Sequence, residues 1–214
     1  MNSFMTPREI EEESLRIIEA EAGPHDHLTR EQWHVVRRMI HATADFDFIT
    51  TARFHPRALD CAAEAVRRKL PIYTDTEMLR AAIGTAARSA GIDVFSFVSD
   101  EEIIRESRDT GLTRSALGLR KAAPKLAGAI VAIGNAPTAL HEAITLCGRG
   151  VLDPALIIGL PVGFVEARES KERLWSSGLV CITNQDRKGG TPATAAALNA
   201  IFKIMRLPAL TESL

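Results

Sequence analysis

The sequence has few cysteines and no excess charge of one sign, and each absence excludes a class of protein. The three cysteines, Cys61, Cys147 and Cys181, stand in mostly apolar surroundings without a CxxC spacing. They predict buried thiols in a reducing compartment, not a disulfide framework or a zinc site. The 26 Lys and Arg balance 27 Asp and Glu, for a formal net charge of -1. Nucleic-acid-binding proteins usually carry a basic excess, so we expect no nucleic-acid partner.

Signals for export or membrane insertion are also missing. Residues 1–13 are too acidic for a signal peptide, and no apolar run approaches the length that spans a bilayer. Together with the cysteines, these absences predict a cytoplasmic protein that has no membrane partner.

Several catalytic and cofactor-binding motifs are absent as well. No GxGxxG follows a strand with an acidic residue beyond it, and the phosphate-loop pattern GxxxxGK[ST] does not occur. There is no HExxH, no paired cysteine ligands and no GxSxG elbow. These absences argue against a dinucleotide site, a dedicated catalytic metal and a serine hydrolase.

Composition and periodicity predict one α/β domain over residues 1–214. Hydrophobic residues make up 46% and charged residues 25%, which is ordinary for a globular protein, and no linker, repeat or low-complexity segment interrupts the chain. Helical spacing is found at 7–22, 30–41 and 56–69, and short apolar segments then alternate with helical patterns. The predicted strands are 71–74, 93–98, 127–133, 155–158 and 178–182. This order predicts a doubly wound, mostly parallel five-stranded sheet with helices on both faces and an N-terminal helical segment.

His41 ends an amphipathic helix and is followed at once by hydroxyl and carboxylate side chains. Val35, Val36, Met39 and Ile40 would bury one face of that helix, which places His41 where a core face meets a loop. Because the unperturbed pKa of histidine lies near neutrality, this side chain suits proton transfer. A structural or capping role is the alternative for a lone histidine at a helix end.

Three glycine-rich turns lie where strands end, at 134–138, 159–163 and 188–191. In open parallel sheets ligands bind beyond the carboxyl ends of the strands, and helix N-termini attract anions. Each turn alone is explained as a tight connection between strand and helix. The three together favour a ligand that carries many carboxylates or phosphates.

Arg114 stands between Thr113 and Ser115 at the start of a predicted helix. A guanidinium there is suited to binding a carboxylate. An N-cap at Thr113 or Ser115 with a solvated arginine is an equally good interpretation. Ser14, a small polar residue beside the apolar side of the first helix, gives only a weak indication of a polar contact.

Several short segments in a fixed order carry a recognisable pattern along nearly the whole chain. The most specific are AIGNAPTAL at 132–140 and GLPVGFV at 159–165. The others are ESLRII at 13–18, HATADFDF at 41–48, YTDTEM at 73–78, ESK at 169–171 and GGT at 189–191. Together these segments resemble the precorrin-8X methylmutase family of cobalamin biosynthesis.

The resemblance implies an isomerase that moves a methyl group from C11 to C12 of a corrin precursor by a 1,5-sigmatropic shift. It implies a corrinoid substrate, no redox or methyl-donor cofactor, cobalt at most as part of the substrate, and a doubly wound homodimer. The continuation Asp45 to Phe48 is more like the cobalt-dependent members and favours cobalt-precorrin-8.

The family's catalytic histidine falls on His41, where it would protonate or hydrogen-bond the ring. We expect Thr43 or Asp45 to orient its imidazole. The resemblance places the substrate-binding residues at Ser14, Arg114, Gly134, Asn135, Thr138 and Gly163. Glu13 departs from the arginine common in the family before the serine, and nothing is carried over for residues 81–94.

Two other functions compete with the methylmutase. A tetrapyrrole carrier without catalytic activity would bind the same ligand, but a carrier has no use for a proton donor such as His41. An α/β enzyme for a nucleotide or phosphorylated metabolite could use the same turns, but the usual fingerprints are missing.

Overall fold

A six-stranded sheet forms the centre of the structure, a computed structural model that describes residues 5–206. The strand order is β1-β6-β5-β4-β2-β3, with β1 antiparallel to β6 and the other pairs parallel. The strands are β1 (Ala52–Phe54), β2 (Ile72–Thr74), β3 (Val94–Phe95), β4 (Ile130–Ile133), β5 (Leu156–Gly159) and β6 (Cys181–Asn184).

The five predicted strands are present as β2 to β6, but the predicted number of strands is wrong. β1 adds a sixth strand, in which Ala52 pairs with Asn184 and Phe54 with Ile182. It has only three half-buried residues between two helices. A segment this short carries no alternation that could have distinguished it from a loop.

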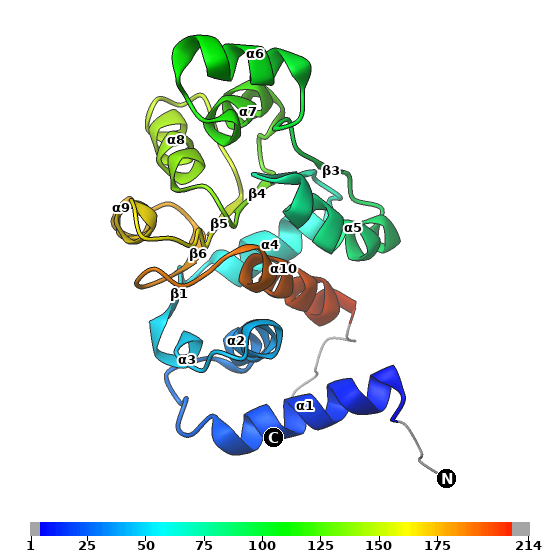
Figure 1. Cartoon of the computed structure of the whole chain (residues 1–214). Coiled ribbons are helices and arrows are strands. Elements are labelled where there is room, and N and C mark those ends of the chain that lie inside the picture. Colours follow the sequence, from blue (N-terminus) through cyan, green and yellow to red (C-terminus); the bar gives the residue numbers. More distant parts are fainter. Residues whose placement is uncertain (1–4, 207–214) are drawn as a thin grey trace.

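Helices cover both faces of the sheet (Figure 1), as predicted. The α-helices are α1 (Pro7–Glu21), α2 (Arg30–Thr43), α3 (Phe48–Thr51), α4 (Ala58–Arg67), α5 (Glu77–Ala90), α6 (Glu101–Thr110), α7 (Arg114–Ala122), α8 (Pro137–Gly148), α9 (Ala167–Ser176) and α10 (Thr191–Arg206). A 3-10 turn, η1 (Ala123–Lys125), follows α7.

The two faces of the sheet bury two separate cores. In β4, Ile130 and Ala132 point to the core formed with α2, α4, α5 and α10. Val131 and Ile133 point to the core formed with α7, α8 and α9. Because successive side chains of a strand point to opposite faces, a strand buried on both sides is continuously apolar, which is the pattern from which β4 was predicted.

The helix that carries His41 is fixed by its cap and by its apolar face. Thr29 and Gln32 form a capping box at the start of α2, and Val35 and Val36 are fully buried. α2 packs on α10, and α1 forms a further layer outside α2, at the bottom of Figure 1. His41 therefore lies in the last turn of a helix whose other side is in the core.

Gly134 allows the end of β4 and the start of α10 to approach closely. A Cβ atom at this position would lie 2.7 Å from Thr194 Oγ1 and 3.3 Å from Thr191 Cα. Contacts this short force a shift of the backbone or of the buried Thr194 side chain. The glycine is thus required for packing between the sheet and α10.

We expect Gly134→Ala to lower the free energy of unfolding by about 2 kcal/mol, the usual cost of overpacking a tight site. Gly148→Ala is the matched control, because a Cβ at the last residue of α8 meets no atom within 4 Å. Urea unfolding of both variants measures the difference. Equal stability of the two variants would contradict the packing role of Gly134.

Candidate functional site

The turn that follows β4 is organised by a buried carboxylate. Asp75, directly after β2, is fully buried and accepts hydrogen bonds from the backbone N–H groups of Gly134 (3.0 Å), Asn135 (2.8 Å) and Ala136 (2.8 Å). Burial raises the pKa of Asp75, and the three amide donors oppose that rise. Asp75 therefore ties the ends of the neighbouring strands β2 and β4 together.

This arrangement corrects one prediction from the sequence. The amide groups at 134–136 do not face an external anion, because the carboxylate of Asp75 already occupies them. Of the two site residues predicted here, Gly134 is buried, whereas Asn135 is exposed. A ligand at this turn would meet the side chain of Asn135 and not the backbone amides.

The starts of α7 and α8 meet beside the same turn. Thr113 Oγ1 lies 2.7 Å from Thr138 Oγ1, and Ser115 Oγ donates to the carbonyl of Asp75 (3.1 Å). Thr113 caps α7 by accepting from Ala116 N–H. The N-cap interpretation of this segment is therefore confirmed for Thr113.

Arg114, between these two hydroxyl residues, keeps its guanidinium available. Its side chain is exposed and forms no hydrogen bond or ion pair with any residue from 5 to 206. The hydrogen bonds of its two neighbours, Thr113 to Thr138 and Ser115 to the carbonyl of Asp75, thus hold the backbone at Arg114 close to the turn after β4. A cation in this position suits a ligand carboxylate.

The third predicted turn, at 188–191, is held by the loop after β5. Gly190 N–H donates to Leu160 O (2.7 Å), and Gly163 N–H donates to Arg187 O (3.1 Å). Gly163 has a φ of 147°, which favours glycine. The turns after β5 and β6 therefore lie together, as predicted, although these amides have internal partners.

The loop before α10 is anchored by a buried lysine. Lys171 on α9 is 1% exposed, and its Nζ donates to Asn184 Oδ1 (3.0 Å) and to the backbone carbonyl of Lys188 (2.6 Å). Burial lowers the pKa of Lys171 to about 8, and the charges of Asp186 and Glu172 oppose this.

The ammonium group of Lys188 reaches across to the segment after His41. It lies 2.9 Å from the carboxylate of Asp45 and also pairs with Asp47. Asp45 in turn accepts from Asp47 N–H (3.0 Å), while Ala44 ends α2 in the left-handed conformation, with φ 53°. The only lysine of the turn at 188–191 is thus paired within the protein and does not face a ligand.

The two side chains expected to orient His41 are engaged elsewhere. Asp45 pairs with Lys188, and Thr43 Oγ1 donates to Met39 O (2.8 Å). The prediction that one of them hydrogen-bonds the imidazole is wrong for this structure. The ring of His41 is half-buried, and no hydrogen bond to it is formed by the described residues.

The charge state of His41 is set by its surroundings. Burial is the largest cause that lowers its pKa, and the charges of Arg38 and Lys203 lower it further. The carboxylate of Glu11 acts in the opposite direction. His41 is therefore a neutral imidazole near pH 7, poised for protonation when negative charge arrives.

Glu11 joins three helices next to His41. Its Oε1 accepts from Lys203 of α10 (2.6 Å) and from Arg38 of α2 (2.5 Å). Its pKa falls to about 2, chiefly through the hydrogen bond from Lys203. Glu11 thus remains ionised over the whole range in which a histidine titrates.

Ser14 forms no hydrogen bond with Glu11, Arg38, His41 or Lys203 among the described residues. Its Oγ donates to Ile10 O within α1 (2.7 Å), which is a common role of serine inside a helix. Glu13, the departure from the family pattern, pairs with Arg16 on the same helix. A substrate contact from Ser14 stays a prediction.

Of the predicted site residues, Arg114, Gly134, Asn135 and Thr138 form one group at the ends of β2 and β4. Gly163 lies at the neighbouring turn, and His41 is connected to that turn through Lys188. Sequence reasoning missed the roles of Asp75, Lys171 and Glu11. Only Asp75 gave a signal, as an acidic residue directly after a strand.

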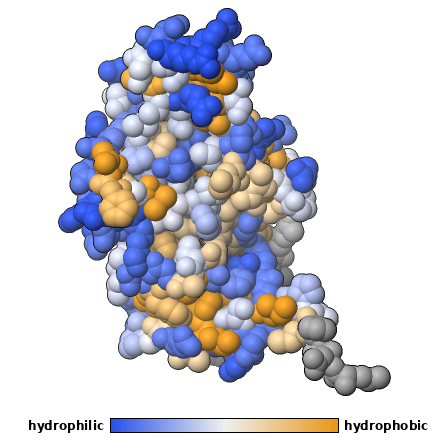
Figure 2. All heavy atoms as spheres, in the orientation of Figure 1, coloured by the Kyte–Doolittle hydropathy of each residue, from blue (hydrophilic) through white to orange (hydrophobic). Residues whose placement is uncertain are grey.

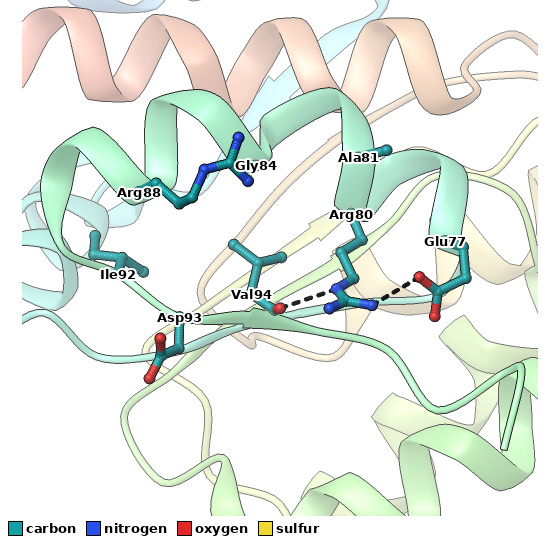
Figure 3. Close-up of a pocket in the computed structure, with 8 residues that line it drawn as sticks. All are labelled: Glu77, Arg80, Ala81, Gly84, Arg88, Ile92, Asp93 and Val94. Carbon is teal, nitrogen blue, oxygen red and sulfur yellow. Dashed lines mark hydrogen bonds and ion pairs between the residues drawn. The ribbon is translucent and has the colours of Figure 1, made fainter.

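A separate pocket of about 370 Å³ lies between α5 and β3 (Figure 3). Arg80 and Arg88 point into it, but Arg80 donates to Val94 O (3.2 Å) and pairs with Glu77. None of the predicted site residues lines this pocket. Between residues 5 and 206 we find no cluster of His, Cys, Asp and Glu suited to a metal ion, and no helix suited to crossing a bilayer.

The doubly wound sheet, with helices on both faces and an exposed arginine at the start of α7, defines the protein as a member of the α/β class. In this class of open parallel sheet, ligands bind beyond the carboxyl ends of the strands. The model of the precorrin-8X methylmutase family matches residues 9–204. The chain belongs to this family of isomerases.

Named relatives and a solved structure agree with this assignment. A cobalt-precorrin-8 methylmutase of Priestia megaterium is 42% identical over 91% of this chain and 87% of its own length. A precorrin-8X methylmutase of a Sinorhizobium species is 37% identical over 91% of this chain and 93% of its own length. The crystal structure of precorrin-8x methyl mutase from Thermus thermophilus superposes with a TM-score of 0.85 at 37% identity, covering 92% of this chain and 96% of that one.

We expect Glu11→Gln to lower the pKa of His41, because the substitution removes the one nearby charge that favours the imidazolium. NMR titration of the histidine rings measures this change. Glu12→Gln is the matched control on the same helix, since Glu12 pairs only with exposed Arg8. An unchanged or raised pKa of His41 in Glu11→Gln would contradict the electrostatic assignment.

Proposed function

We propose that this protein moves a methyl group from C11 to C12 of precorrin-8X or cobalt-precorrin-8 in cobalamin biosynthesis. The product is hydrogenobyrinic acid or cobyrinic acid, respectively. The match of residues 9–204 to the methylmutase family carries this proposal. Relatives that are 42% and 39% identical are both named cobalt-precorrin-8 methylmutase, and this supports the cobalt-containing substrate.

His41 is the proposed catalytic residue. A proton or hydrogen bond given by the imidazole to the ring makes the carbon that receives the methyl group electron-poor. The half-buried ring without an internal hydrogen-bond partner is free to do this. The reaction is a rearrangement within one molecule, so atoms and electrons balance without a methyl donor, an oxidant or a reductant. We therefore propose that the protein uses no cofactor, and that any cobalt belongs to the substrate.

Arg114 is the proposed carboxylate-binding residue, supported by its exposed, unpaired guanidinium next to Thr113, which contacts Thr138. Thr138, Asn135, Gly134 and Gly163 would shape the same rim. We propose that they contact the ligand through their side chains and their exposed surface. The backbone amides of Gly134 and Gly163 already donate to other residues of the protein.

Two features beyond the site belong to this proposal. Phe164 is 85% and Val165 78% exposed, and such apolar side chains beside α9 supply surface that a homodimer would bury. Figure 2 shows hydrophobic residues near α9 and over the region of α1 to α3.

The three cysteines are free, which supports the cytoplasm as the compartment.

His41→Ala tests the catalytic assignment. General acid catalysis contributes roughly 10²- to 10⁴-fold, so we expect turnover to fall at least about 100-fold while the product still binds. Visible absorption of precorrin-8 and cobalt-precorrin-8 reports conversion directly, because the conjugation of the ring changes when the methyl group migrates. His34→Ala, on the same helix, is the control and should convert substrate as the wild type does.

The same spectra separate the proposed enzyme from its alternative. A shift of the bound ligand without conversion, identical in wild type and His41→Ala, would indicate the non-catalytic tetrapyrrole carrier. Conversion by the wild type at an unchanged rate in His41→Ala would remove His41 from the mechanism but keep the activity.

The pH dependence of catalysis should show the perturbed histidine. If the protonated ring is required, kcat/KM is highest at low pH and falls as pH rises through the pKa of free His41, which lies below its ordinary value of 6.5. A bound polycarboxylate raises that pKa, so the fall in kcat should occur at higher pH than the fall in kcat/KM. Rate measurements from pH 5 to 8 check this, with His34→Gln as a variant that should keep both profiles. Coincident profiles would contradict the proposed effect of the substrate charge.

A further inference from the structure

The segment ESK at 169–171 carries the family resemblance but has no role in the site described so far. Lys171 is its unusual member, because an ammonium group that is only 1% exposed is rare and costs free energy to bury. Ser170 beside it is also fully buried, with Oγ donating to Ala167 O within α9. A buried lysine on the rear side of the loop before α10 needs an explanation.

The hydrogen bonds of Lys171 go to the end of β6 and to the loop that follows it. Its Nζ donates to Asn184 Oδ1 and to the carbonyl of Lys188, and Asn184 Nδ2 donates to the same carbonyl (2.9 Å). The backbone of Lys188 is therefore held by two side-chain donors at one oxygen. On the other side of the loop, the Lys188 ammonium pairs with Asp45 and Asp47.

We propose that Lys171 and Lys188 form a positioning relay that fixes the segment after His41, and with it the histidine, against the loop before α10. In this relay Lys171 fixes the backbone of Lys188, and the side chain of Lys188 then fixes Asp45 and Asp47. Both are positioning residues, because neither has to touch the substrate. The inference rests on the proposed role of His41.

The geometry favours such a relay over an ordinary surface ion pair. Exposed ion pairs usually contribute little to stability, because ordering two long side chains costs entropy. Here the main chain of Lys188 is already fixed, and one ammonium group bridges two carboxylates that are two residues apart. Asp45 also accepts from Asp47 N–H, so the bridge closes the turn that ends α2 only four residues after His41.

A relay of this kind affects catalysis more than stability. A displacement of about 1 Å in a catalytic group can cost up to about 100-fold in rate. His41 has no hydrogen bond of its own within residues 5–206, so its position depends on the helix end that carries it. Loosening the turn at 44–47 would therefore be transmitted to the imidazole directly.

The test compares Lys188→Met and Lys188→Arg in the full-length protein. We expect Lys188→Met to lower kcat about tenfold with little change in KM and in the midpoint of thermal unfolding. Lys188→Arg, which can still bridge both carboxylates, should restore kcat to within about twofold of the wild type. Lys121→Met removes a comparable exposed lysine that pairs with Asp100 and Glu102, and should leave kcat unchanged.

A second measurement does not depend on activity. Amide hydrogen exchange over residues 44–48 should be faster in Lys188→Met and in Lys171→Met than in the wild type, and unchanged in Lys121→Met. If Lys171→Met fails to fold, Lys188→Met alone still decides, since Lys188 is exposed. Wild-type exchange over residues 44–48 in Lys188→Met would overturn the relay, and so would a wild-type kcat in that variant.

The outcome also separates this inference from the proposed function. If the wild type converts neither corrin precursor, the proposed function fails. The exchange rates over residues 44–48 still show whether Lys171 and Lys188 fix the segment after His41. If the wild type converts substrate and His41→Ala does not, but Lys188→Met has wild-type kcat, the relay is wrong and the function stands. A loss of kcat in Lys188→Met that arginine does not rescue would also count against the relay.

Discussion

The buried carboxylate of Asp75 is the interaction on which the rim of this protein depends. A charge in the interior is costly unless hydrogen bonds compensate for it, and three backbone amides of the β4–α8 turn do so. The backbone carbonyl of Asp75 also accepts a hydrogen bond from Ser115 Oγ, which holds the start of α7 close to the end of β2. Through its side chain and its backbone carbonyl, this one residue thereby fixes β2, β4, α7 and α8 relative to one another.

This constraint determines which groups remain for a ligand. Parallel sheets collect helix N-termini at one edge, and such an edge would attract anions through many amides. Here several of the amide N–H groups at this edge already donate to Asp75 and to the carbonyls of Leu160 and Arg187, so they are not available to a ligand. In the proposed function, ligand binding therefore depends on side chains such as that of Arg114, because a guanidinium binds a carboxylate with a defined geometry.

The sequence allowed the fold to be predicted well because its main features are periodic. The continuous apolar run of β4 and the apolar face of α2 are local patterns, and both occur as expected. β1 was missed because three residues carry no period. The roles of Asp75 and Lys171 were missed for another reason. The partners of the Asp75 carboxylate lie 59 or more residues away in the sequence and those of the Lys171 ammonium lie 13 or more residues away, so only folding brings them together.

The electrostatics around His41 link its proposed catalytic role to the charge of the proposed substrate. Burial and two cations keep the free imidazole neutral, with Glu11 limiting the effect. In the proposed mechanism, a methyl migration changes neither the carboxylates of the ring nor its net charge, so a proton given to the ring returns to the histidine in every turnover. A histidine that could not be protonated would fail in the first of these steps. Glu11 limits the lowering of the pKa of His41 by burial, Arg38 and Lys203, and a bound polyanionic substrate would raise this pKa further.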